Sequence, residues 1–216
     1  MSTIIYVGGQ KGGTSKTTTA HLLCLGAVLK RQPAAYVLTD PHRRVKSEGR
    51  PYGVLDGRDG NALAQVITSS RVTQNGWLII DGGGNRPSFD QVMTRQAYLT
   101  LLPFRVSEED TDAVALDLES LPQAIALPAA WPTNRYARAS AQRLIDELSA
   151  RFPDRVVTSP VDFVNSTAEL VGTSLDNPAS VLRNAARSAF ALLQQVWFTR
   201  ADSLSRDTAA WRDRAP

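Results

Sequence analysis

Residues 8–19 read Gly-Gly-Gln-Lys-Gly-Gly-Thr-Ser-Lys-Thr-Thr-Thr, a glycine-rich stretch that ends in a lysine and three threonines. The apolar run 3–7 before it is typical of a β-strand, and residues 16–30 after it have the pattern of a helix. Glycines between a strand and a helix let successive backbone N–H groups point inward, beside the positive N-terminal end of the helix dipole. The stretch therefore predicts a loop that binds phosphate groups.

Two residues at the start of this helix carry the chemistry expected of such a loop. Lys16 is placed to contact the β- and γ-phosphates of a nucleotide, and the Thr17 hydroxyl is placed to bind Mg²⁺. The strict pattern has a glycine directly before the lysine, whereas this chain has Ser15, which is small enough to turn. We therefore expect ATP or ADP to bind with Mg²⁺. The contacts are expected from Gly9, Gln10, Lys11, Gly12, Gly13, Thr14, Ser15, Lys16, Thr17 and Thr18.

Short apolar runs alternate with longer helical patterns along the chain, as in repeated βαβ units. Strands are expected near residues 3–8, 35–39, 52–55, 77–81, 98–104, 123–128 and 155–158. Helices are expected over 16–30, 61–70, 88–96, 111–121, 139–152 and 178–198. This order predicts an α/β fold of the P-loop NTPase type: a doubly wound, mostly parallel sheet with helices on both faces, in three layers. One domain over residues 1–201 is expected, followed by a loosely held C-terminal tail over 202–216.

Two aspartates follow predicted strands. Asp40 comes after the second strand, and Asp81 ends the apolar run 77–80, which is continuous, as expected of a strand buried on both faces. Alone, each aspartate is equally well explained as a helix cap or turn former. In the same way, a glycine-rich loop on its own is also explained as a turn without a ligand. Open α/β sheets bind ligands at the carboxyl ends of their strands, where the loop and both aspartates would meet. Together they predict one site at this edge of the sheet.

Residues 11–18, Lys-Gly-Gly-Thr-Ser-Lys-Thr-Thr, resemble the deviant Walker A motif of the ParA/MinD family. The mark of that family is an additional lysine early in the loop, here Lys11. The resemblance implies that Lys11 reaches across a dimer to the phosphates bound by the other subunit. Nucleotide binding and dimerisation would then be one event, in an ATP-dependent homodimer with two ATP molecules at its interface.

Two other segments are similar to that family in order and spacing. Residues 36–41, Tyr-Val-Leu-Thr-Asp-Pro, resemble its Asp-x-Asp-Pro segment and keep only the second aspartate, Asp40, which implies a place in the first switch region near Mg²⁺ and the attacking water. Residues 77–81 resemble a Walker B strand. The family often continues with Thr-Pro-Pro, whereas residues 82–85 are Gly-Gly-Gly-Asn here, which indicates a more flexible second switch. The resemblance thus implies catalytic roles for Lys11, Lys16 and Asp40, and metal binding by Thr17, Asp81 and Asp40.

The composition is that of a soluble globular protein, with 216 residues of which 43% are hydrophobic and 21% charged. A signal peptide is not recognisable at the start of the chain, and the single Cys24 excludes an internal disulfide, which favours a reducing cytoplasm. We expect a bacterial cytoplasmic protein associated with the nucleoid. The lack of further cysteines also excludes relatives of the nitrogenase iron protein, because their bridging cluster needs them.

Basic residues gather in two places. The segment 42–50, His-Arg-Arg-Val-Lys-Ser-Glu-Gly-Arg, would contact DNA or an acidic partner in one nucleotide state, or else forms a solvated loop. The C-terminal region carries arginines where ParA relatives have a surface for non-specific DNA, although three aspartates dilute the charge. These arginines are Arg183, Arg187, Arg200, Arg206, Arg212 and Arg214, interleaved with Asp202, Asp207 and Asp213. No membrane partner is expected, because core packing explains Trp197 and Phe198 more simply than membrane binding.

The resemblance implies an ATPase that hydrolyses ATP slowly and segregates or positions a plasmid or other cargo over non-specific DNA. A ParB-like protein or another cargo adaptor is the implied partner and would stimulate hydrolysis. Two alternatives share the fold: an accessory ATPase of conjugative transfer or plasmid stability, and a nucleotide-gated scaffold with little hydrolysis. A metabolic enzyme of the dethiobiotin synthetase kind would transfer phosphate to a small molecule. Lys11 and the lack of an obvious second-substrate constellation argue against that enzyme.

Overall fold

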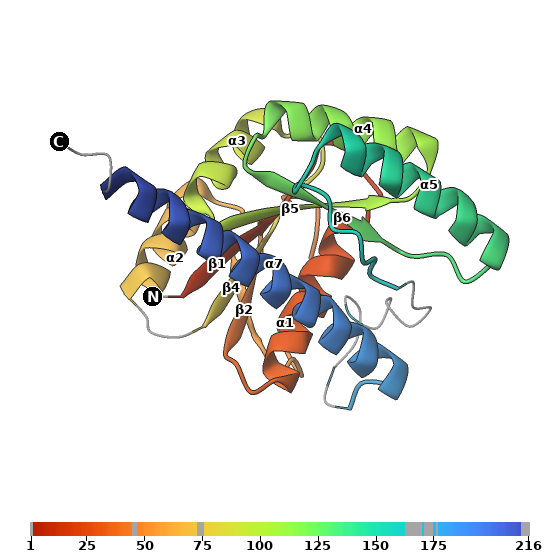
Figure 1. The fold of residues 1–216 in the computed structure, drawn as a ribbon. Coiled ribbons are helices and arrows are strands. Elements are labelled where there is room, and N and C mark those ends of the chain that lie inside the picture. The colour runs from red at the N-terminus through yellow and green to blue at the C-terminus, as the bar shows by residue number, and fades with distance from the viewer. Residues whose placement is uncertain are drawn as a thin grey trace.

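A parallel sheet of six strands in the order β3-β2-β4-β1-β5-β6 forms the centre of the molecule (Figure 1). The computed structural model describes residues 2–44, 47–72, 76–162 and 177–212, with residues 170 and 175; of residues 71–72 and 201–212 it describes the backbone alone. Each strand lies close to its predicted place. The strands are β1 (Thr3–Val7), β2 (Ala34–Leu38), β3 (Gly53–Asp56), β4 (Trp77–Asp81), β5 (Leu99–Arg105) and β6 (Ala124–Ala129).

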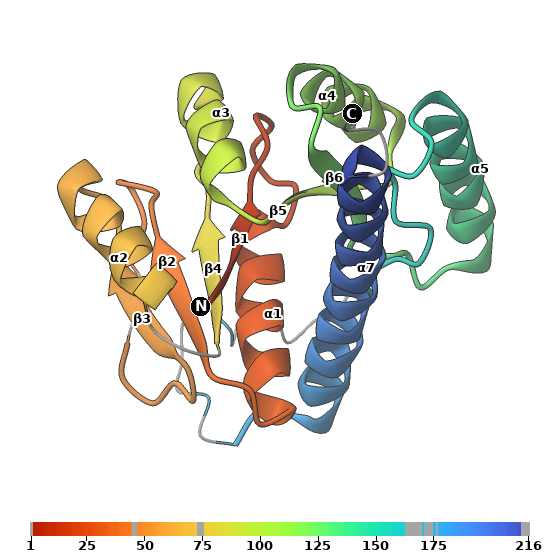
Figure 2. The ribbon, with the colours of Figure 1, turned by 60° about the vertical axis from the view of Figure 1, so that its left-hand side comes forward.

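Helices cover both faces of this sheet, so the fold has the three layers, α/β/α, that the sequence predicts (Figure 2). One face carries α1 (Lys16–Leu29) and α7 (Ser180–Arg212), which lie side by side. The other face carries α2 (Gly60–Val72), α3 (Pro87–Gln96) and α4 (Glu108–Ser120), with α5 (Arg135–Arg151) beside α4. In the described part of the chain, no helix combines the length and apolar character needed to cross a bilayer.

The central strands are apolar on both sides because both faces of the sheet are covered. Along β1, Ile5 and Val7 belong to the core beneath α1 and α7, while Ile4 and Tyr6 belong to the core beneath α2 and α3. Successive side chains along a strand therefore pack into two separate cores, one on each face of the sheet. This explains why residues 77–80 form a continuous apolar run in the sequence.

The strand predicted at 155–158 is wrong: Val156 forms only an isolated bridge with Ala126 of β6. Backbone bonds join Ala126 to residues 155 and 157, and the next contact is Val161 N–H to the Pro128 carbonyl. Pro128 has no N–H group to donate, so a regular ladder cannot continue along β6 at this point. Arg155 instead fixes the segment by donating to the carbonyls of Leu118, Leu121 and Ala124.

The last helix is longer than the sequence predicted. α7 continues to Arg212, so the backbone of residues 202–212 is helical. Residues 199–212 contain neither glycine nor proline, and nothing in their sequence stops a helix once it is started by the packed residues before them. Val45, Lys46, Asp213 and Arg214, which belong to the predicted basic clusters, lie outside the described residues.

The contact between α1 and α7 depends on Gly26. A methyl group at this position would run into the carbonyl oxygen of Ala186 and the side chain of Phe190, both on α7. Glycine inside a helix normally costs about 1 kcal/mol relative to alanine. Here the lack of a side chain lets two helices approach closely over the sheet.

We therefore expect Gly26→Ala to lower the free energy of unfolding by about 1–3 kcal/mol, the scale of overpacking in a core, although alanine is the better helix former. Urea denaturation followed by circular dichroism measures this change. Gly60→Ala is the control, because a methyl group there meets nothing within 4 Å. Equal stability of the two variants would contradict the packing role of Gly26.

Candidate phosphate-binding site

The register of three strands brings the predicted site residues to one edge of the sheet. β4 pairs with β1 and with β2, and Val7 and Leu38 both lie level with Asp81. The glycine-rich loop follows Val7, and Thr39 and Asp40 follow Leu38. The loop, Asp40 and Asp81 therefore meet at the carboxyl ends of adjacent parallel strands, where open α/β sheets bind ligands.

Three residues give the loop its path. Gly9 and Gly13 have φ angles of 122° and 77°, which glycine adopts readily. Ser15 has a φ of 73° and lies directly before α1. It thus takes the left-handed conformation that suits the glycine of the strict pattern, at a cost on the order of 1 kcal/mol. The backbone path is kept although the residue differs.

Lys16 lies inside the loop. Its side chain is buried, and its ammonium group donates to the Lys11 carbonyl at 2.5 Å and to the Thr14 hydroxyl at 3.5 Å. Burial lowers the pKa of Lys16, while the negative charges of Asp81 and Asp90 oppose that shift. The loop thus encloses a cation whose hydrogen bonds go to the loop itself.

Asp81 and Thr17 are both buried beside Lys16. One carboxylate oxygen of Asp81, Oδ2, accepts a hydrogen bond from Tyr36 at 2.6 Å. The other, Oδ1, is buried and has no hydrogen-bond partner among the described residues. Burial raises the pKa of Asp81, and the Tyr36 and Thr17 hydroxyls lower it. A hydroxyl and an open carboxylate oxygen are the donors that Mg²⁺ prefers, so these residues fit that ion.

Asp40 lies in a tight turn after β2. One of its oxygens accepts from the His42 N–H at 3.0 Å, and the other pairs with Arg43 at 3.3 Å. Arg43 is close enough to Lys16 and Asp81 to lower the pKa of both groups. The structure therefore brings Asp40 to the same region as the loop, with its carboxylate engaged by its own turn.

The glycines after Asp81 are packed against the loop. A methyl group on Gly84 would lie 3.3 Å from the Gln10 carbonyl and 3.5 Å from the Gly12 nitrogen, and a methyl group on Gly82 would run into the Tyr6 hydroxyl. The Asn85 N–H donates to the Gln10 carbonyl at 2.8 Å. Gly84 thus permits the backbone after Asp81 to approach the loop backbone, and Gly82 leaves room for the Tyr6 side chain. The sequence interpretation of a flexible switch did not include these contacts.

Sequence reasoning missed two buried carboxylates that hold Gln10. Asp90 on α3 accepts hydrogen bonds from the Gln10 amide and the Tyr6 hydroxyl. Asp117 on α4 accepts from the Gln10 backbone N–H at 3.0 Å. Burial raises the pKa of Asp90 to about 6, and the charge of Asp117 adds to the shift. The available signal is an aspartate at an inward position of each helix, but no local pattern shows what it contacts.

Lys11 points away from Lys16. Its ammonium group forms ion pairs with Glu109, at 2.8 Å, and with Asp110, both in the first turn of α4. The Lys11 side chain is 26% exposed. Hydrogen bonds to Asp110 and Glu109 raise its pKa. The acidic start of α4 is visible in the sequence, whereas its pairing with Lys11 is not.

A strand, a glycine-rich loop and a helix that begins with buried Lys16 and Thr17, beside an aspartate that ends a neighbouring strand, define the P-loop NTPase class of fold. No protein-family model matches the sequence, and no curated protein matches it significantly. The likeness to solved structures lies in the fold.

Three solved structures illustrate this likeness. McdA of Cyanothece without ligand has a TM-score of 0.62 and 14% identity, with 89% of this chain and 100% of that chain covered. Cobyrinic acid a,c-diamide synthase of Mycobacterium smegmatis, with a bound ATP analogue and magnesium, has a TM-score of 0.65 and 16% identity over 90% and 95%. The pNOB8 ParA bound to non-specific DNA has a TM-score of 0.57 and 13% identity over 97% and 99%. The chain thus has the fold of the ParA/MinD-type ATPases, as the sequence predicted.

The raised pKa of Asp90 predicts how stability depends on pH. The folded chain holds the Asp90 proton more tightly than the unfolded chain, because the pKa rises from 3.8 to about 6. The contribution of this proton to the free energy of unfolding is therefore complete below pH 3.8 and is lost as the pH rises to about 6. Asp90→Asn removes this loss. Urea denaturation between pH 4 and 7.5 measures the free energy of unfolding of both proteins. The value for the wild type, relative to that for the variant, is expected to fall up to about pH 6 and to be constant above about pH 7.

Tyr6→Phe provides the contrast, because the Tyr6 hydrogen bond lowers the pKa of Asp90. Its loss should move the upper end of the pH window to a higher value. Parallel pH curves for the wild type and Asp90→Asn would contradict the assignment.

Proposed function

We propose that this chain is a ParA-like ATPase that binds ATP with Mg²⁺ in the loop 9–18 and dimerises around the bound nucleotide. The observation that supports this most is the divergence of two lysines in one loop. Lys16 is buried among the loop atoms, as a conventional P-loop requires, whereas Lys11 lies at the surface and is paired with α4. A conventional P-loop enzyme has no use for the second lysine.

The residues of the site have distinct tasks in this proposal. Lys16 and the backbone N–H groups of residues 9–18 hold the β- and γ-phosphates, and Thr17 and Asp81 hold Mg²⁺. When bound, Mg²⁺ neutralises phosphate charge and stabilises the charge that develops during transfer. Asp40 orients the attacking water near the metal, for which its carboxylate has to leave Arg43 and the His42 N–H. Slow hydrolysis is consistent with an Asp40 that rests in that turn.

Lys11 changes partner in this cycle. In the single chain its charge is balanced by Glu109 and Asp110. In the dimer it reaches the nucleotide of the other subunit, stabilises the interface and offsets charge on the phosphates during hydrolysis. The ion pair with α4 therefore competes with dimerisation.

The proposed task of the cycle is to segregate or position a plasmid or another cargo, with a ParB-like protein or other adaptor as the stimulating partner. Of the similar structures, pNOB8 ParA is bound to non-specific DNA. An accessory ATPase of conjugative transfer and a scaffold with little hydrolysis share the same fold. ATP turnover separates the scaffold from the other two, and the cargo separates partition from transfer.

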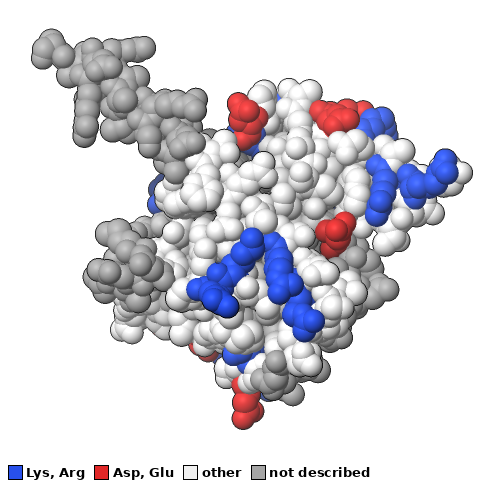
Figure 3. Space-filling model, turned by 60° about the horizontal axis from the view of Figure 1, so that its bottom comes forward, with Lys and Arg blue, Asp and Glu red and all other residues white. Residues whose placement is uncertain are grey.

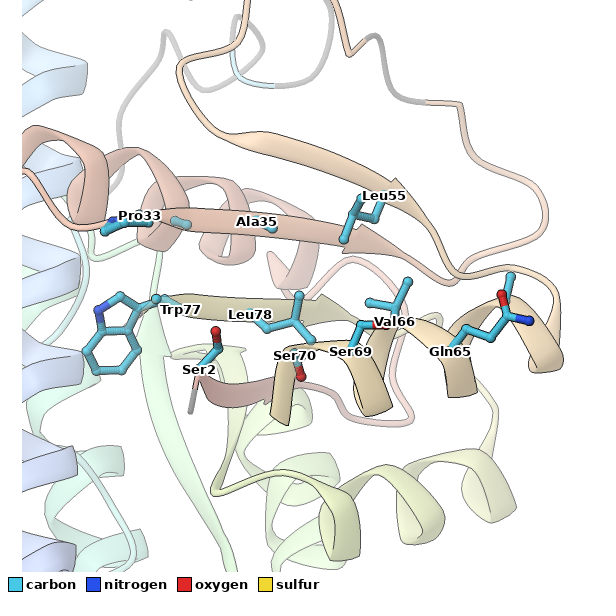
Figure 4. Close-up of a pocket in the computed structure, with 13 residues that line it drawn as sticks. Ser2, Pro33, Ala35, Leu55, Gln65, Val66, Ser69, Ser70, Trp77 and Leu78 are labelled. Carbon is cyan, nitrogen blue, oxygen red and sulfur yellow. The ribbon is translucent and has the colours of Figure 1, made fainter. Parts of the chain in front are cut away.

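The likeness to cobyrinic acid a,c-diamide synthase favours a metabolic enzyme as the second candidate. Such an enzyme needs room for another substrate beside the phosphates. A pocket of about 780 Å³ lies between α2 and the start of β2 and β4, where Leu55, Val66 and Leu78 line it (Figure 4). Ser2, Pro33 and Gly76 also line it, which places it at the amino ends of the strands. That end is opposite the loop, so the pocket does not serve the phosphates.

Dimerisation tests the proposal. Asp40→Ala is expected to bind ATP and form a dimer with little turnover, which light scattering detects. Adding Lys11→Ala should abolish the dimer yet keep ATP affinity, whereas Lys16→Ala should lose ATP binding by a few kcal/mol, the scale of a charge-assisted contact. In the wild-type background, Lys11→Ala should lower turnover by about 10³-fold, the scale of a charge supplied by a partner.

The pairing with α4 gives a sharper form of the same test. Glu109→Gln with Asp110→Asn frees Lys11 and is expected to strengthen ATP-dependent dimerisation severalfold. Glu119→Gln with Asp146→Asn changes the net charge equally, on α4 and α5 but away from Lys11, and should have no effect. If Lys11→Ala dimerises as the parent does, Lys11 does not act across a dimer and the proposal fails.

The end of α1 and the start of α7 lie side by side and carry basic residues, which supports the proposed binding of non-specific DNA. Lys30 and Arg31 follow α1, and Arg183 and Arg187 lie in the first turns of α7. Gly26 meets Ala186, so the end of α1 lies beside the start of α7. Figure 3, which brings the bottom of the molecule forward, shows Lys and Arg side chains gathered at the centre of that face. A duplex would meet these charges on one subunit, because the end of α1 lies at the amino ends of the strands, opposite the loops that face each other in the proposed dimer.

ATP is expected to raise the affinity for random-sequence duplex DNA, and the affinity should fall steeply with salt. In Arg31→Ala/Arg187→Ala, the slope of log affinity against log salt should decrease by about one for each lost phosphate contact. Arg95→Ala/Arg135→Ala, with the same loss of charge on α3 and α5, should keep the slope. Fluorescence anisotropy measures both. Equal slopes in the two double variants would place DNA binding elsewhere.

A further inference from the structure

Asp81 is held by a buried tyrosine that neither the sequence nor the proposed function assigns to the site. Tyr36 lies in β2, is fully buried and donates its hydroxyl to Asp81 Oδ2 at 2.6 Å. A phenol holds its proton at neutral pH and a carboxylate does not, so Tyr36 is the donor in this hydrogen bond.

This hydrogen bond distinguishes the two oxygens of Asp81. Oδ2 is engaged by Tyr36, while Oδ1 is buried and, within the described residues, has no hydrogen-bond partner. An unpaired carboxylate oxygen is costly in a protein interior unless a ligand is to occupy it. Thr17 lies near enough to lower the pKa of the same carboxylate. Asp81 therefore has an open oxygen, Oδ1, and lies beside the Thr17 hydroxyl.

Tyr36 is itself held in place by other buried groups. The ring of His21 stacks on it with centroids 4.0 Å apart and an angle of 14°. The Nδ1 atom of His21 lies 2.8 Å from the Tyr52 hydroxyl, which also accepts from Arg50 at 2.9 Å. The hydrogen bond between His21 Nδ1 and the Tyr52 hydroxyl holds the imidazole ring in its orientation. Burial lowers the pKa of His21 to about 3, so the ring is neutral.

We propose that Tyr36 is a positioning residue for the metal site: its hydroxyl fixes the Asp81 carboxylate so that Oδ1 is presented to the Mg²⁺ that accompanies the nucleotide. The stacked His21 and its bond to Tyr52 keep the Tyr36 ring at the correct place. This inference depends on the proposed nucleotide site and adds a residue that does not contact the nucleotide. Groups that orient metal ligands typically change metal affinity by about 10- to 100-fold when they are removed.

Tyr6 provides a matched control within the chain. Tyr6 and Tyr36 are both fully buried, lie on the two strands that flank β4 and donate to a buried carboxylate. The Tyr6 acceptor is Asp90, which holds the amide of Gln10 and is not proposed to bind metal. A loss of metal affinity that is specific to Tyr36 would therefore not follow from the loss of a buried hydroxyl as such.

The experiment measures Mn²⁺ binding by electron paramagnetic resonance in the presence of ADP, and ADP binding by calorimetry in EDTA. Tyr36→Phe is expected to weaken Mn²⁺ binding by about 10- to 100-fold and to leave the metal-free ADP affinity within about twofold of the wild type. Tyr6→Phe should leave Mn²⁺ binding unchanged. Mn²⁺ affinity at the wild-type value in Tyr36→Phe overturns the inference, as does an equal loss in both variants.

Two outcomes are kept apart by this design. If the wild-type chain binds ADP in neither condition, the proposed nucleotide site fails, and the inference fails with it. If the wild type binds ADP and Mn²⁺ but Tyr36→Phe does so equally well, only the inference fails. His21→Leu serves if Tyr36→Phe does not fold, because it removes the stacked ring and keeps the hydroxyl. Unchanged Mn²⁺ affinity in that variant also overturns the inference.

Discussion

The parallel pairing of β4 with β1 and β2 is the constraint on which the site depends. It places Val7, Leu38 and Asp81 level at one edge of the sheet. The loop, the turn with Asp40 and the triple glycine all leave the sheet at this edge, so their backbones are crowded into a small volume. The close contacts of Gly82 with Tyr6 and of Gly84 with the loop follow from that crowding. A side chain at Gly84 would press on the loop backbone, and one at Gly82 would run into the Tyr6 ring.

Charge balance shapes the same region. Burying Lys16 is unfavourable for its ammonium group, and the carboxylates of Asp81, Asp90 and Asp117 oppose this effect. Without an anion in the loop, these carboxylates are the negative charges that compensate Lys16. A nucleotide brings several further negative charges close to Asp90 and Asp117, whose pKa values are already raised by burial. Mg²⁺ would offset part of that excess, which is a physical reason why nucleotide and metal should bind together.

The sequence predicts what is local and periodic. It places six strands and six helices in the right order, because buried parallel strands and amphipathic helices have distinct patterns. The loop is recognisable from its glycines between a strand and a helix, and Asp81 becomes a candidate only together with the loop, because it ends a neighbouring buried strand. The contacts of Gln10 with Asp90 and Asp117 join residues that are 80 and 107 positions apart, and no pattern within one helix specifies them. Residues 155–158 have the residue types of a strand, but the adjacent strand β6 contains Pro128, which cannot donate a hydrogen bond to them. The wrong prediction thus came from a pairing that the segment 155–158 alone does not show.

The two sets of acidic residues around the loop differ in how easily they can change partners. Asp90 and Asp117 are buried and bonded to Gln10, and breaking such bonds leaves unsatisfied polar groups in the interior. Lys11 is paired with Glu109, which is 86% exposed, and with Asp110, whose side chain is only 10% exposed. Water can replace Lys11 at Glu109, where an exposed ion pair contributes little to stability, whereas Asp110 would lose its partner in a largely buried place. In the proposed cycle, the loop has to stay rigid while Lys11 exchanges its partners on α4 for the nucleotide of a second subunit. The inner carboxylates keep the shape of the loop around Lys16. Exchange of Glu109 for water costs little, while the loss of Lys11 from the largely buried Asp110 has to be offset by the contacts that Lys11 would make at the proposed dimer interface.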